Sequence, residues 1–158
     1  MREMSRIVRT VTTLIYGFII VYGFYVILHG HLTPGGGFQG GAIVASAFAL
    51  LIVTYGNQGV KGFLKKDILS LFESSGLIIF IAVAFFGLGV TFFYNFLANS
   101  GNLFGNAAVI GINAGDMNTG GIIPILNIAV GIEVLAALGV IIMTMSAGSE
   151  ITKKKENS

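Results

Sequence analysis

The sequence predicts an all-α integral membrane protein with four transmembrane helices, and three observations lead to this fold class. Hydrophobic residues make up 54% of the 158-residue chain and charged residues only 10%, whereas a soluble domain carries about 25% charged residues. Mean hydropathy is +0.88. Four apolar runs each reach the roughly 20 residues that a helix needs to cross a bilayer. The runs are continuous and do not alternate, which favours helices over the strands of a barrel.

The whole chain, residues 1–158, is predicted to form a single membrane domain. The first apolar core is longer than that of a signal peptide and has no A-x-A site after it, so we expect a retained anchor. The predicted spans are about 10–30, about 36–56, about 75–97 and about 121–145, followed by a cytoplasmic tail at 146–158.

The basic residues predict the orientation of these spans. All nine fall on one side: Arg2, Arg6, Arg9, Lys61, Lys65, Lys66, Lys153, Lys154 and Lys155. Because cytoplasmic loops carry the excess of Lys and Arg, both termini and the middle connection are predicted to be cytoplasmic. We therefore expect a multi-pass protein of the cell (plasma) membrane.

The connection before the third span, KGFLKKDILSLF, has apolar residues at helical spacing. Leu64, Ile68, Leu71 and Phe72 form one stripe, which favours a short interfacial helix lying on the cytoplasmic surface. A solvated connector and a helix packed on a partner subunit are the alternatives.

The stretch TPGGGFQGG, residues 33–41, opens the second span. Thr33 suits an N-cap and Pro34 the first helical position, so the helix is predicted to begin there. Small-residue pairs at i, i+4 let another helix approach closely, which makes tight packing the main expected role. The alternative is a partly unwound helix start that faces an ion or water path. The residues concerned are Pro34, Gly35, Gly36, Gly37, Phe38, Gly40 and Gly41.

This stretch, together with the four-span layout and PILNIAVGIEV in the fourth span, resembles the MnhB family. That family comprises the MnhB subunits of Mrp-type multisubunit Na⁺/H⁺ antiporters and the matching subunits of membrane-bound hydrogenase and sulfane reductase complexes. The resemblance implies a small integral subunit that binds no cofactor and works within a complex coupling proton and sodium movement. It implies other integral subunits, membrane lipid, Na⁺ and H⁺ as partners.

The fourth span departs from the antiporter pattern at two positions. Antiporter-type members tend to carry an acid where this chain has Asn127, and an apolar residue where it has Glu133. This pattern is more similar to the subunits of hydrogenase and sulfur-reducing complexes. No antiporter acid can therefore be assigned to position 127.

Four polar residues are candidates for an ion path: Glu133, Asn127, His29 and His31. An acid near the middle of a span costs about 2.5–3.5 kcal/mol to insert, so Glu133 is expected to face protein or water. It handles a proton or sodium ion, or it stays protonated and makes one interhelical hydrogen bond. The two histidines lack a third ligand for a metal, and helix capping or an interfacial place is favoured for them over a proton path.

Other function classes find little support in the sequence. The chain has no cysteine, which excludes disulfides and cysteine-ligated clusters. A nucleophile–base pair, a metal cluster and a cofactor fingerprint are all missing, so we expect no enzyme active site in this chain by itself. The net charge is only +2, and the basic residues lie beside apolar runs, which argues against binding of nucleic acid. A cation/proton-translocating complex is the leading context for this subunit; a self-sufficient homo-oligomeric transporter or channel and a pure scaffold subunit are the alternatives.

Overall fold

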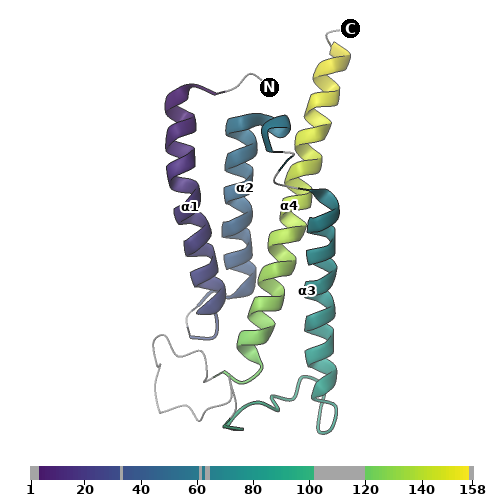
Figure 1. Cartoon of the computed structure of the whole chain (residues 1–158). Helices are drawn as coiled ribbons and strands as arrows, with labels where there is room; N and C mark the ends of the chain where they lie inside the picture. Colours follow the sequence, from purple (N-terminus) through teal and green to yellow (C-terminus); the bar gives the residue numbers. More distant parts are fainter. Residues whose placement is uncertain (1–3, 33, 61, 63–64, 102–119, 157–158) are drawn as a thin grey trace.

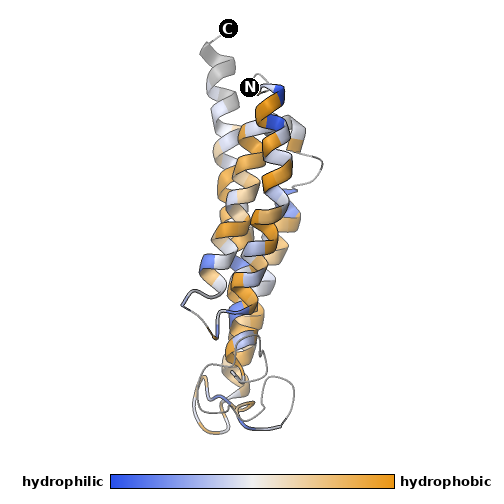
Figure 2. Cartoon of the chain, turned by 90° about the vertical axis from the view of Figure 1, so that its left-hand side faces the viewer, coloured by the Kyte–Doolittle hydropathy of each residue, from blue (hydrophilic) through white to orange (hydrophobic). Residues whose placement is uncertain are grey.

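The computed structural model describes residues 4–32, 34–60, 62, 65–101 and 120–156, and its regular elements are four α-helices. They are α1 (Arg6–Leu28), α2 (Gly37–Val60), α3 (Lys66–Phe86) and α4 (Ile123–Glu156). All four are long and apolar enough to cross a membrane by length and composition. Figure 2 shows apolar residues along most of the length of the helices. The predicted all-α class with four long apolar helices is confirmed.

The helices form a row in which successive elements run in opposite directions (Figure 1). Helix α2 packs against α1 on one side and α4 on the other, and α4 packs against α3. Helix α4 barely contacts α1. Both termini lie at the same end of the row, which we call the terminal end, and the α1–α2 connection lies at the opposite, or loop, end (Figure 1).

The two outer helices expose most of their apolar surface. In α1, 17% of the residues in its most apolar stretch are buried, against 44% in α2. Phe18 of α1 is 70% exposed and Phe86 of α3 is 74% exposed. Side chains of this kind are stable on the surface only in lipid or against another apolar protein surface.

Helix α3 begins and ends earlier than the predicted third span at 75–97. It begins at Lys66, so the segment up to Phe72 is the first part of this helix, and the structure corrects the expectation of a separate interfacial helix. The apolar stripe expected for that helix continues without a break into the apolar run. Leu64 lies outside the described residues.

After Gly87 the chain folds back instead of extending the helix. The Phe93 amide donates to the Ala84 carbonyl at 3.2 Å. The aromatic rings of this segment then pack on the end of α3, with Phe80 and Phe93 edge to face at 5.5 Å between centroids. Residues 87–97 are apolar enough to resemble a span, but they form turns stabilised by aromatic contacts.

Two further features differ from a simple four-span picture. Helix α2 is broken at Gly56, whose φ of 76° and ψ of 163° only glycine adopts readily. Helix α4 continues to Glu156, so most of the predicted tail at 146–158 is helical. Side chains of the three tail lysines are not among those described.

Candidate functional site

The connection between α1 and α2 ends in two glycines with left-handed backbone. Gly35 has φ 146° and Gly36 has φ 107°, which residues with a Cβ rarely adopt. Helix α2 therefore begins at Gly37, with the Gly40 amide donating to the Gly36 carbonyl at 3.1 Å. Pro34 lies outside the helix and is exposed, which corrects its predicted place as the first helical residue. Thr33, the predicted N-cap, lies outside the described residues.

One face of the α2 start lies directly on the backbone of α4. A Cβ added at Gly37 would overlap the Asn127 carbonyl oxygen and lie 2.9 Å from the Gly131 nitrogen. A Cβ added at Gly41 would lie 2.8 Å from the Gly131 oxygen. Any side chain at these positions would separate the two helices. We call Gly30, Gly36, Gly37, Gly41, Asn127 and Gly131 the glycine junction.

The next face of α2 lies on α1. A Cβ at Gly40 would overlap the Ile27 side chain and lie 2.7 Å from the Gly23 oxygen. Phe38, by contrast, points outward and is 64% exposed. The residues at 36–41 thus place α2 against both neighbours within about one turn, with the pair at 37 and 41 on α4 and Gly40 on α1.

The Asn127 side chain lies inside the glycine junction. A Cβ at Gly30 would lie 2.9 Å from Asn127 Nδ2, and one at Gly36 would lie 3.1 Å from Oδ1. The Nδ2 atom is buried and has no hydrogen-bond partner among the described residues. Buried amides are normally hydrogen-bonded, so Asn127 is a polar group of the glycine junction whose partner the described residues do not supply.

The two histidines lie at the loop end but contact different elements. The backbone N–H of His29 caps α1, its Nδ1 lies 3.2 Å from the Tyr25 carbonyl oxygen, and its ring stacks on Tyr25 at 4.1 Å. His31 lies beside the start of α4, where a Cβ at Gly120 would be 3.1 Å from its Cδ2. In the described part of the chain, no group of three or more His, Asp or Glu residues is placed to hold a metal ion.

Glu133 belongs to a different interface from Asn127. A Cβ at Gly76 of α3 would lie 2.9 Å from Glu133 Cβ and 2.7 Å from the Ala129 oxygen. Glu133 is half-buried, and within the described chain its carboxylate has no hydrogen-bond or ion-pair partner. It lies six residues after Asn127, which on a helix is about 9 Å along the axis and about 120° around it. The structure therefore does not bring these two candidates together.

Two polar residues that the sequence did not single out as ion-path candidates lie at helix contacts. Glu73 is half-buried and lies one turn before Gly76, about 10 Å along α3 from Lys66. It therefore shares the α3–α4 interface with Glu133. Extending the third span back to Lys66 at helical spacing would have indicated this position of Glu73. Asn95 holds the start of α4: its Oδ1 accepts from the Ile122 amide at 2.9 Å and its Nδ2 donates to the Gly120 carbonyl at 3.2 Å. No local signal pairs residues 25 positions apart.

Comparisons with known proteins agree with this architecture. The uncharacterized protein MJ1307 of Methanocaldococcus jannaschii is 35% identical over 142 residues, which are 89% of this chain and 52% of that protein. A putative antiporter subunit mnhB2 of Staphylococcus aureus is 42% identical over 67 residues, 42% of this chain and 48% of that protein. The chain thus spans about half the length of the curated relatives it matches.

A solved structure shares the fold. It is a chain of the membrane-bound sulfane sulfur reductase, an archaeal respiratory membrane complex, with a TM-score of 0.75 and 28% sequence identity over 92% of this chain and 59% of that one. The chain is a multi-pass membrane protein. The family model described as "Domain related to MnhB subunit of Na+/H+ antiporter" matches residues 7–144, so this chain belongs to the MnhB family.

Proposed function

We propose that this chain is a non-catalytic membrane subunit of a multisubunit complex that translocates cations and protons. The observation that carries the proposal is the match of residues 7–144 to the MnhB model. The same fold in a chain of a respiratory membrane complex supports it. Other integral subunits of such a complex are the proposed partners.

The half-buried carboxylates of the α3–α4 interface favour a role next to other subunits. An ionisable side chain inside a membrane span is costly unless it pairs or faces water. Glu133 finds no partner among the described residues of its own chain, so a neighbouring subunit or water would complete its surroundings. Glu73, one turn away from the same contact, would share them.

We place the terminal end of the row in the cytoplasm, because the basic residues gather there. The glycine junction would then lie on the outer side of the membrane, and Lys65 at the inner side. Proton or sodium movement along this subunit would pass Glu133 at the α3–α4 interface and would be completed by neighbouring subunits. The alternative role of Glu133 is a neutral acid that makes one hydrogen bond to another subunit.

Replacing Glu133 in the assembled complex separates these roles. The change Glu133→Gln keeps the shape and hydrogen-bonding capacity but removes the titrating group. Loss of sodium-coupled proton movement with normal assembly would support the ion-handling role. Unchanged movement with normal assembly would exclude that role and leave a scaffold function. Asp67→Asn is the matched control, since Asp67 is exposed in the first turn of α3 and should tolerate the change.

Purification of the tagged chain in mild detergent tests the proposal itself. Co-purification with long, many-span membrane subunits is expected. A homogeneous homo-oligomer that carries out ion transport alone would overturn the proposal in favour of a self-sufficient transporter.

A further inference from the structure

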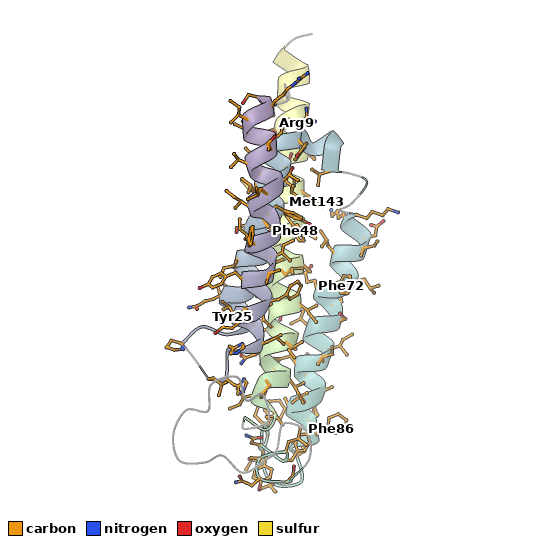
Figure 3. All side chains as sticks on the ribbon, turned by 60° about the vertical axis from the view of Figure 1, so that its left-hand side comes forward. Arg9, Tyr25, Phe48, Phe72, Phe86 and Met143 are labelled. Carbon is orange, nitrogen blue, oxygen red and sulfur yellow. The ribbon has the colours of Figure 1, made fainter. Side chains whose placement is uncertain are left out.

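The row of helices leaves a groove between its two outer members. Tyr16, Phe24 and Leu28 of α1 form one wall and Phe72 of α3 part of the other, while Leu135 and Gly131 of α4 lie on the floor. The groove consists of two adjoining hollows of about 360 and 430 Å³, which share Phe24, Phe72 and Leu135. Figure 3 shows Phe72 projecting from α3 into the space beside α1.

The groove has a polar mouth and an apolar depth. At the terminal end Lys65 lines the mouth. Toward the loop end every lining residue is apolar. Lys66 and Asp67 follow in the sequence but do not line the groove. Among the described lining residues, Lys65 is thus the single cationic group above an apolar groove.

The dimensions of the groove fit a lipid chain. Along α1 it runs from Tyr16 to Leu28, twelve residue steps of 1.5 Å each, or about 18 Å. One leaflet of the hydrocarbon core is half of about 30 Å, or about 15 Å.

From this geometry we propose that the groove between α1 and α3 binds an anionic phospholipid whose headgroup lies at the Lys65 end of the groove. One acyl chain lies along Phe24, Phe72 and Leu135, and the phosphate lies at the Lys65 ammonium. Lysine near a membrane surface attracts anionic lipid, and its stem packs on the apolar mouth while the charge reaches the headgroup. Lys65 also precedes the first turn of α3 and makes no side-chain cap hydrogen bond there. This site does not rest on the proposed transport function.

Tryptophan quenching gives a direct test, because the chain has no Trp of its own. The full-length Phe72→Trp variant is placed in phosphatidylcholine vesicles that contain brominated phosphatidylglycerol or, at equal mole fraction, brominated phosphatidylcholine. We expect the brominated phosphatidylglycerol to be preferred about fivefold at this position. Adding Lys65→Gln should abolish the preference, and adding Lys66→Gln should leave it. In Phe18→Trp, on the exposed outer face of α1, the two lipids should quench equally.

Two results would overturn the proposal. One is equal quenching of the Phe72→Trp variant by both lipids, or a preference that survives Lys65→Gln. The other is loss of quenching when the same variant is assembled with its partner subunits, which would show that protein fills the groove. If Phe72→Trp does not fold, Ile68→Trp carries the same measurement, because Ile68 lines the mouth and is 48% exposed.

Discussion

The two ends of α2 are held by different kinds of contact. At the loop end, Gly37 and Gly41 lie directly on the backbone of α4. At the terminal end, side chains join α2 to α1: the Thr12 and Thr54 hydroxyls are buried and 2.9 Å apart, and the Tyr55 hydroxyl lies 2.6 Å from Thr13 Oγ1. Backbone contacts cannot adjust to an added atom, whereas side chains can rotate away. The loop end should therefore tolerate far less change than the terminal end.

The largest effect is expected at the loop end, from Gly41→Leu. Its Cβ alone would lie 2.8 Å from the Gly131 carbonyl oxygen, and neither helix backbone can move without breaking other contacts. We expect a loss of stability of about 3 kcal/mol or more, seen as loss of monodisperse protein in detergent size-exclusion chromatography.

Gly17→Leu is the matched control for this change. It introduces the same side chain into an apolar helix at a position with nothing within 4 Å. Its elution and yield should equal those of the unmodified chain. If both variants behave alike, the glycine junction is not the tight contact described.

The sequence was sufficient to predict features that arise locally. Apolar runs of about 20 residues specify where helices cross, and small residues at i, i+4 specify where Gly37 and Gly41 permit close packing. The register of α3 was not predictable in the same way. Lys65, Lys66 and Glu73 place charges before residue 75, so the apolar run appeared to begin later, while the aromatic residues after Gly87 appeared to continue it.

Contacts between distant residues were beyond sequence reasoning. The order of helices in the row, with α4 between α2 and α3, depends on which small faces meet in space. Composition and spacing identified Asn127 and Glu133 as polar residues in one span. They did not reveal that the two face different helices, because that depends on where α2 and α3 dock.

A second prediction concerns the start of α4, also at the loop end but held by a side chain. Asn95→Ala removes two hydrogen bonds, to the Ile122 amide and the Gly120 carbonyl. A loss of about 2 kcal/mol is expected, from roughly 1 kcal/mol for each bond, measured as a lower unfolding temperature in detergent. Asn95→Asp keeps the acceptor for the Ile122 amide but sets a carboxylate oxygen against the Gly120 carbonyl, so it should cost at least as much as Asn95→Ala. An unfolding temperature equal to that of the unmodified chain in either variant would contradict the assignment.

A third, smaller effect is expected at the terminal end from Thr54→Val. This change leaves the buried Thr12 hydroxyl without its partner and should lower the free energy of unfolding by about 1 kcal/mol. The double variant Thr12→Val, Thr54→Val removes both hydroxyls. Its loss of unfolding free energy should therefore be smaller than the sum of the two single losses. A double-mutant cycle on denaturant unfolding measures this coupling, and strict additivity would show that the hydroxyls do not interact.

The smallest effect is expected from Tyr55→Phe. This change removes the hydroxyl contacts to Thr13 and to the Arg9 carbonyl, but it keeps the ring, over which the Arg9 guanidinium lies at 5.3 Å. Thr13 and Arg9 are on the exposed side of α1 or partly so, and water can replace the lost partner, so the change in unfolding free energy should stay within about 0.5 kcal/mol. Tyr55→Leu also removes the ring and should cost more. If Tyr55→Phe were as damaging as Gly41→Leu, the terminal end would be as rigid as the loop end, and the contrast between the two ends of α2 would fail.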